Sequence, residues 1–151
     1  MDPHIFSTSA NIFQQLFPER QLRMSLSDVD HALVSIPTNA TEVNAIAPAA
    51  ADTITACLKN VFTDGKMTLS DFPIILRTIN DIAKNVNTLN ILNVKASSVI
   101  DVLEVIICVV FQMVLPPGEY DIARTILVPA FGLLRTNITT SKTLKMLLCC
   151  K

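Results

Sequence analysis

The sequence predicts an all-α protein, a small irregular helical bundle with about four core helices. Apolar residues recur at spacings of three and four over most of residues 41–136, which is the period of an amphipathic helix. Alternating runs bounded by hairpin turns are nearly absent, and only Ile91 to Val94 could form a strand. The length of 151 residues fits one domain. We expect an extended N-terminal arm over residues 1–40, a helical core over 41–136 and a basic C-terminal tail over 137–151.

Prolines divide residues 1–40 into short pieces, at Pro3, Pro18 and Pro37. This pattern predicts an extended arm with short helices. A cluster of phenylalanines in the arm would be costly to leave in water. We therefore expect Phe13 and Phe17 to pack, either on the chain's own core or on a neighbouring protein.

The first core helix is predicted to begin near Pro48, because the first turn of a helix tolerates proline. It is predicted to end near Phe62. Its apolar face is formed by residues at spacings of three and four, namely Ala51, Ile54, Leu58 and Val61.

The second core helix has the clearest pattern in the sequence. Its apolar face runs from Phe72 to Leu89 through Ile75, Ile79, Ile82 and Val86. Thr68 or Ser70 can cap its N-terminus, and Thr68 with Asp71 resembles a capping box. Pro73 must then lie in or near the first turn, which favours Ser70 as the cap.

The third core helix is predicted to begin at Ser97 or Ser98 and to end at Leu115, before two prolines and a glycine. It is apolar except for one narrow polar stripe, formed by Ser97, Asp101, Glu104, Cys108 and Gln112. A helix with so small a polar face is central to a bundle or covered by partners. The Asp101 and Glu104 carboxylates lie one turn apart in apolar surroundings. We expect this pair to meet Arg or Lys from a partner or from the basic tail, and the change Glu104→Leu to be tolerated for folding while weakening assembly.

The fourth core helix is predicted over Tyr120 to Leu134, bent or broken at Pro129. From Ser141 the tail can form a short basic helix with three leucines on one side, Leu144, Leu147 and Leu148.

The composition indicates a chain with more apolar surface than one small domain can bury alone. Half of the residues are hydrophobic, 17% are charged and the mean hydropathy is +0.47, whereas about 25% charged is typical. We therefore expect partner proteins to cover part of the surface, especially around Val109 and Phe131.

The charge is unevenly distributed along the chain. Residues 1–121 hold all thirteen acidic residues and seven of the twelve Lys and Arg. Residues 122–151 hold no acid and five basic residues, which are Arg124, Arg135, Lys142, Lys145 and Lys151. This end suits an acidic protein partner or an anionic lipid surface, or is a solvated tail. The net charge of −1 gives no whole-chain attraction to nucleic acid.

The sequence contains no pattern typical of an enzyme. His4 and His31 both lie in the N-terminal part, and no serine stands in a G-x-S-x-G elbow. Asp28 and Asp30 beside His31 are predicted to be an exposed charge cluster. The four cysteines lack metal-ligand spacing, so no metal site is expected. No catalytic residue and no cofactor is expected either. Cys149 and Cys150 are candidates for palmitoylation.

Residues 60–71 resemble a degenerate EF-hand calcium loop. Asn60 stands at the first ligand position, Asp64 at the fifth, Gly65 at the turn and Asp71 at the twelfth. Phe62 replaces the oxygen ligand at the third position, and Asp71 is shorter than the usual glutamate. A helix-loop-helix joint without calcium is the simpler interpretation.

The run from Val61 to Pro73 is followed by an isoleucine-rich helix and then by an apolar helix. Over about residues 45–135 this arrangement resembles a short helical module in proteins of large icosahedral double-stranded DNA viruses. In that setting such small chains are similar to minor capsid proteins, which lie beneath the major capsid shell and above an internal membrane. The resemblance implies a non-enzymatic structural protein that cements neighbouring capsomers in the virion and is assembled in the host cytoplasm.

The partners that the resemblance implies are the major capsid protein and neighbouring minor capsid proteins, with the surface of the internal membrane as a further candidate. Neither nucleic acid nor a small-molecule substrate is expected. The candidate interaction residues are Phe13, Phe17, Asp101, Glu104, Arg124, Arg135, Lys142 and Lys145. Two alternatives stay open: a membrane-associated helical protein that uses residues 98–134 and the basic tail, and a calcium-type helix-loop-helix binding module.

Overall fold

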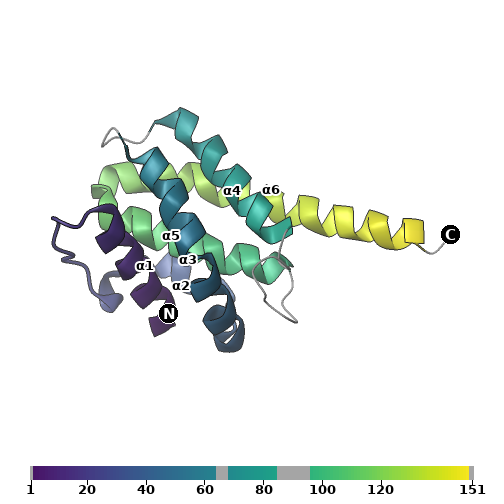
Figure 1. Ribbon diagram of the computed structural model, residues 1–151, viewed down its shortest axis with the longest axis horizontal. Helices are drawn as coiled ribbons and strands as arrows, with labels where there is room; N and C mark the ends of the chain where they lie inside the picture. Colours follow the sequence, from purple (N-terminus) through teal and green to yellow (C-terminus); the bar gives the residue numbers. More distant parts are fainter. Residues whose placement is uncertain (1, 64–67, 85–95, 150–151) are drawn as a thin grey trace.

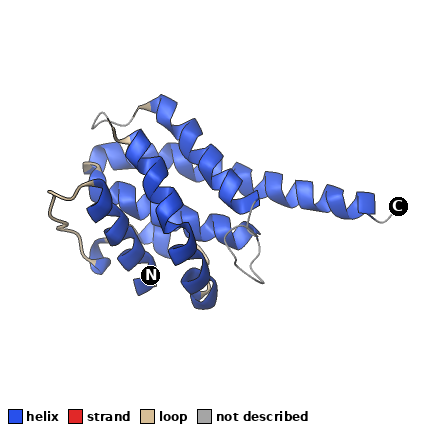
Figure 2. Cartoon of the chain, in the orientation of Figure 1, coloured by secondary structure: helices blue, strands red, loops and turns tan. Residues whose placement is uncertain are grey.

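The computed structural model confirms the all-α prediction. It describes the backbone of residues 2–63, 68–84 and 96–149, and the side chains of these residues except 83–84, 96 and 137–149. Six α-helices and two 3-10 turns form a bundle, and the described residues contain no strand (Figures 1 and 2). The elements are α1 (Pro3–Leu16), η1 (Leu26–Asp28), α2 (His31–Val34), α3 (Ala40–Val61), η2 (Leu69–Asp71), α4 (Phe72–Lys84), α5 (Ala96–Val114) and α6 (Pro117–Cys149).

Helix α5 lies at the centre of the bundle. It contacts α1, α3, α4 and α6, and its residues from Val102 to Phe111 are all at most 2% exposed. Apolar side chains occur around almost its whole circumference, so neighbours on several sides are needed to bury them. The structure supplies those neighbours from the same chain.

Residues 1–40 were predicted to form an extended arm, but in the structure part of this segment packs into the core. Asp2 accepts a hydrogen bond from the backbone N–H of His4 at 2.8 Å, and Pro3 occupies the first turn, so the proline starts α1 instead of breaking it. Ile5, Ile12 and Phe13 on α1 are buried against α3 and α5. The phenylalanine cluster of the arm therefore packs on the chain's own core.

Helix α3 begins at Ala40, eight residues before the predicted start at Pro48. Asn39 caps it by accepting a hydrogen bond from the N–H of Thr41 at 2.8 Å. Val43 and Ile46 are fully buried, and their packing holds the first turns in place. Pro48 consequently lies inside the helix, where one backbone hydrogen bond is lost.

Helix α4 is preceded by a capping box, with Thr68 as the capping residue. The N–H of Thr68 donates to Asp71 Oδ2 at 2.8 Å, and the Thr68 hydroxyl bonds the same oxygen at 3.2 Å. The prediction of Ser70 as the cap is therefore wrong: the 3-10 turn η2 precedes α4, so Pro73 still falls in the first turn of α4. The end of the predicted helix, residues 85–89, and the possible strand at 91–94 lie outside the described residues.

Helix α6 is one helix of 33 residues, not a helix broken at Pro129 followed by a separate tail helix. Pro129 is exposed, so the carbonyl that loses its backbone partner can bond water. The C-terminal part of α6 projects from the bundle and ends far from its other helices (Figure 1). The basic tail predicted as a separate region is the continuation of this core helix.

Candidate functional site

Helix α6 is held against the centre of the bundle by a cluster of three charged residues. Arg135 Nε lies 2.6 Å from Asp101 Oδ1, and Arg135 Nη2 lies 2.9 Å from Glu104 Oε2. Asp101 and Glu104 are three residues apart on α5, so both point to the same side. The sequence predicted that this pair meets a basic residue from a partner or from the basic tail. In the structure that residue is Arg135 of the same chain, which lies on α6 just before residues 137–151.

Glu104 is the most buried member of this cluster, with 3% of its side chain exposed. Burial raises the pKa of Glu104 and the Asp101 charge adds to this rise, while the hydrogen bond and charge of Arg135 act in the opposite direction. Its Oε1 atom is buried and has no hydrogen-bond partner. Glu104 is therefore tied to α6 through one oxygen only.

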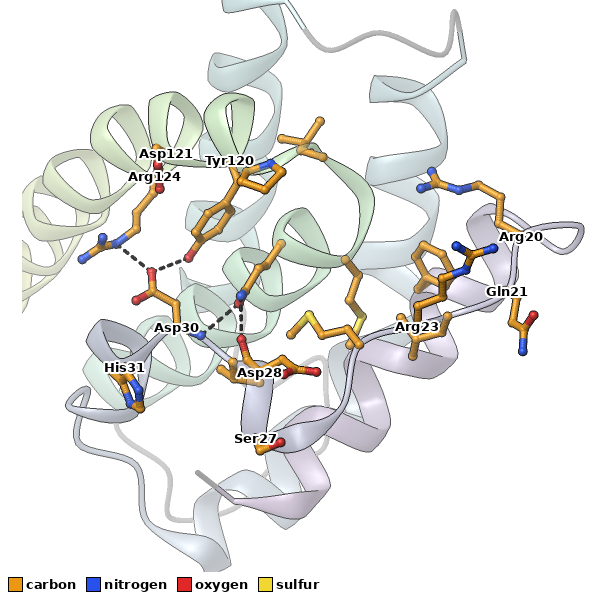
Figure 3. A pocket seen from close by; sticks show the side chains of 18 residues that line it. Arg20, Gln21, Arg23, Ser27, Asp28, Asp30, His31, Tyr120, Asp121 and Arg124 are labelled. Carbon is orange, nitrogen blue, oxygen red and sulfur yellow. Dashed lines mark hydrogen bonds and ion pairs between the residues drawn. The ribbon is translucent and has the colours of Figure 1, made fainter.

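A second cluster joins the N-terminal part of the chain to the start of α6. The Tyr120 hydroxyl donates to Asp30 Oδ2 at 2.8 Å, and Arg124 Nε lies 3.4 Å from the same oxygen (Figure 3). Gln112 on α5 completes the cluster, because its amide donates to the Asp28 carbonyl at 2.8 Å and accepts from the Asp30 N–H at 3.0 Å. The cluster links η1, α2, α5 and α6.

The electrostatics of the second cluster are opposite to those of the first. Burial acts to raise the pKa of Asp30, but bonds from the Ala32 N–H and the Tyr120 hydroxyl and the Arg124 charge outweigh it, so this pKa is lowered. Burial also raises the pKa of Tyr120, and the bond to Asp30 raises it further. Asp30 therefore stays ionised and Tyr120 stays protonated at neutral pH.

An open cavity of about 950 Å³ lies beside this cluster. Figure 3 shows Asp28, Asp30 and Tyr120 on one side and Arg20 and Arg23 on another. Acidic and basic side chains both line it. The Arg20 guanidinium is stacked 4.9 Å from the Phe17 ring centroid and 5.4 Å from that of Phe13. The contact of Asp30 with Tyr120 was not predicted from the sequence, because the two residues are 90 positions apart. The stacking of Arg20 was not predicted either, although Phe13 and Phe17 precede it closely in the chain.

Exposed apolar side chains gather on α6 and near its start. Leu69 is 72% exposed, Leu133 67% and Ile122 64%. Between residues 122 and 136, α6 contains two charged residues, Arg124 and Arg135, and both pair with carboxylates of the bundle. The outward face of this stretch is therefore uncharged, and its exposed residues are Ile122, Thr125, Val128, Pro129, Leu133 and Thr136.

The structure brings most of the predicted interaction residues into contacts within the chain. Phe13 is buried, Phe17 is half-buried and lies 5.9 Å from it, centroid to centroid, and Arg124 and Arg135 form ion pairs. The side chains of Lys142 and Lys145 lie outside the described set. Val109 and Phe131, expected to need a partner, are fully buried by the chain's own helices. The apolar surface that remains is mainly the outward face of α6 and its surroundings.

The EF-hand-like segment is described only at its two ends, since residues 64–67 lie outside the described residues. Asp71, at the twelfth ligand position, is engaged in the capping box with Thr68. Phe62, at the third position, is 8% exposed and lies edge-on to Phe111. Over the described part of the chain, no group of three or more His, Cys, Asp or Glu is placed to hold a metal ion.

The described cysteines lie in protected positions. Cys108 is buried on α5, and burial raises its pKa to about 12. Burial likewise raises the pKa of Cys57. Both thiols are therefore protonated at neutral pH.

Helix α5 is long and apolar enough to cross a membrane. The window Ser97–Val114 has a mean hydropathy of 2.1, and 72% of it is buried inside the bundle. The central helix of a bundle has the same composition as a membrane-spanning helix, because each of them is surrounded by apolar groups.

Comparison of the chain with protein-family models, with curated proteins and with solved structures finds no match.

Proposed function

We propose that this chain is a non-enzymatic structural protein that joins neighbouring protein subunits. More specifically, we propose a minor capsid protein that cements capsomers beneath the outer shell of a large icosahedral double-stranded DNA virus. The partners are the major capsid protein and neighbouring minor capsid proteins. The sequence resemblance over about residues 45–135 supports the viral setting.

The observation that carries the proposal is the uncharged outward face of α6. Arg124 and Arg135 pair with Asp30, Asp101 and Glu104, so the exposed side of the helix between residues 122 and 136 presents Ile122, Val128 and Leu133 with no unpaired charge. Apolar side chains that line up on one face of an exposed helix mark a protein interaction surface. A capsid subunit that buries this face gains the free energy of removing these side chains from water.

Purified virus particles give the test of this proposal. The chain is expected in a fixed ratio to the major capsid protein, measured by quantitative mass spectrometry, and the ratio is expected to persist after detergent removes the internal membrane. The variant Leu133→Asp is expected to fold normally and to be depleted from particles, with Lys59→Asp on the exposed end of α3 as a matched control. A chain absent from particles, or one lost with the membrane lipids, would contradict the proposal.

Membrane association is the second candidate function, and the Ser97–Val114 window is the observation in its favour. It requires α5 to leave the helices that now cover it, or the outer face of α6 to rest on lipid. Carbonate extraction tests the first case, because a spanning chain stays in the membrane pellet, and flotation with lipid vesicles tests the second. Release of the chain by carbonate together with no flotation would argue against this candidate.

A further inference from the structure

An apolar groove lies between the start of α4 and the start of α6. Its volume is about 690 Å³, and its floor is formed by aromatic and aliphatic side chains that include Phe62, Phe72 and Leu115. Leu69 and Ile122 line it and are also two of the most exposed large apolar residues in the described part of the chain. Such a groove resembles those that receive the apolar face of an amphipathic helix.

The far end of α6 projects away from the other described helices (Figure 1). Residues 137–149 continue α6 beyond the bundle for about 20 Å at 1.5 Å per residue (Figure 1). The sequence of this end places Leu144, Leu147 and Leu148 at spacings of three and four, which gives one apolar side. It therefore has the pattern of a helix that binds in a groove.

The projecting end cannot reach the groove of its own chain. Glu119, Ile122 and Ala123 line the groove from the first turns of α6, whereas the projecting end is the last part of the same continuous helix. The helix is about 50 Å long, so its two ends point away from each other. Only a second molecule can bring an end and a groove together.

The charges of the two surfaces are complementary. Among the described residues that line the groove, Glu119 is acidic and Arg20 is basic, but the Arg20 guanidinium is engaged by the Phe13 and Phe17 rings. Asp71 and Asp121 stand two residues from Leu69 and Glu119. The end of α6 contains Lys142 and Lys145 and no acid. Opposite charges at the rim favour encounter and fix orientation.

We propose that the groove between η2 and α6 binds the C-terminal end of α6 from a second copy of this chain. The contact is head-to-tail, since each copy offers a groove at one end and a helix at the other. Repetition of such a contact yields open chains or rings, and reciprocal exchange of the two ends between two copies yields a closed dimer. The inference extends the proposed structural role by naming a second copy as one partner, and its test needs no virus particle.

The test uses sedimentation velocity of the full-length chain over about 10 to 200 μM, where a micromolar contact is populated. The wild type is expected to associate into dimers or larger species as concentration rises. Leu69→Asp places a charge in the groove and Leu147→Asp places one on the apolar side of the binding helix, and each is expected to weaken association at least about tenfold. Leu133→Asp, on α6 but outside both surfaces, is the matched control and is expected to associate like the wild type.

Mixing the two association-deficient variants gives the sharpest result. Leu69→Asp keeps an intact end and Leu147→Asp keeps an intact groove, so their mixture is expected to form one-to-one dimers and nothing larger. Circular dichroism checks that each variant is folded. A monomeric wild type, a dimer that only one of the two variants disrupts, or a mixture that stays monomeric would overturn the proposal. A virion test that fails while the mixture dimerises would instead contradict the capsid role alone.

Discussion

Helices α5 and α6 follow one another in the chain and lie against each other, but they are stabilised in different ways. Helix α5 is covered by α1, α3, α4 and α6, and its described polar residues mostly bond within the chain, as Asp101, Glu104 and Gln112 do. Helix α6 is fixed on its inner side by Arg124 and Arg135, and it presents an uncharged face outward. We infer that α5 determines the stability of this bundle, whereas α6 offers the surface for partners.

The largest effect is expected from truncating a central residue of α5. Phe111 is 1% exposed, and its ring lies 5.9 Å from that of Phe62 in an edge-on arrangement. Phe111→Ala is expected to lower the free energy of unfolding by about 3–5 kcal/mol. Leu133→Ala on α6 is the comparison, because its side chain is exposed, and about 0.5 kcal/mol or less is expected. Urea denaturation measures both, and equal costs would remove the distinction between the two helices.

The next effect concerns the ion pairs between α6 and the bundle. Arg135→Leu leaves the Glu104 carboxylate buried without a partner, so a loss of about 2–3 kcal/mol is expected. Arg124→Leu leaves Asp30 with the bonds from Ala32 and Tyr120 and is expected to cost about 1 kcal/mol or less. Thermal and urea unfolding decide the order of the two. A larger loss for Arg124→Leu would contradict the account of Glu104 as the costly group.

Replacing Glu104 itself is expected to be tolerated. Glu104→Leu removes a carboxylate from an apolar place and leaves Arg135 partly exposed and bound to Asp101, so a change within about 1 kcal/mol is expected. The same unfolding assay measures it, with Arg135→Leu as the reference. A loss as large as that of Arg135→Leu would show that the ion pair as a whole stabilises the fold.

The pH dependence of stability is expected to distinguish Glu104 from Asp30. The folded-state pKa of Glu104 is raised above 4.5, so its contribution to stability is fully present below the unfolded-state pKa and is lost as pH rises through the folded-state value. The wild type should therefore gain stability relative to Glu104→Gln as pH falls from neutral towards 4.5. Asp30 behaves oppositely, because its pKa is lowered from 3.8: its contribution is present above 3.8 and is lost as pH falls through the folded-state value. Urea midpoints at each pH test this, and parallel curves for wild type and Glu104→Gln would refute it.

A small stabilising effect is expected at Gly132, in the middle of α6. A Cβ built there meets no atom within 4 Å, and the residue lies inside a helix. Gly132→Ala is expected to raise the free energy of unfolding by about 0.5–1 kcal/mol, because the unfolded chain loses freedom that the helix does not use. A decrease in the thermal midpoint would indicate that α6 bends or packs at this position.

Local patterns predicted the helices well where one apolar face is regular, as along Phe72, Ile75 and Ile79 of α4. The predicted helix boundaries were wrong near prolines, because the surrounding structure decides whether a proline starts a helix, ends it or lies within it. Pro3 starts α1, Pro48 lies within α3 and Pro129 lies on the exposed side of α6. The local sequence pattern does not show which of these three positions a proline will take.

The pair of carboxylates on α5 could be predicted from the sequence, and the region that supplies its basic partner could be predicted in part. Asp101 and Glu104 stand out because they are one turn apart in an apolar helix, and Arg135 belongs to the basic end that the charge distribution indicated. The Asp30, Tyr120 and Arg124 cluster was not predictable, since its partners lie about ninety residues apart and each looks like an ordinary surface residue. The burial of α5 depends in part on α1, which the sequence predicted to belong to an extended arm.

Site-specific photo-crosslinking in assembled particles tests most directly whether the outward face of α6 joins subunits. A photoreactive residue at position 133 is compared with one at position 59, which is exposed on α3. We expect position 133 to form a covalent adduct with another capsid subunit and position 59 to form none or far less. Equal yields at the two positions, or adducts only to lipid at position 133, would contradict the assignment of this face to protein assembly.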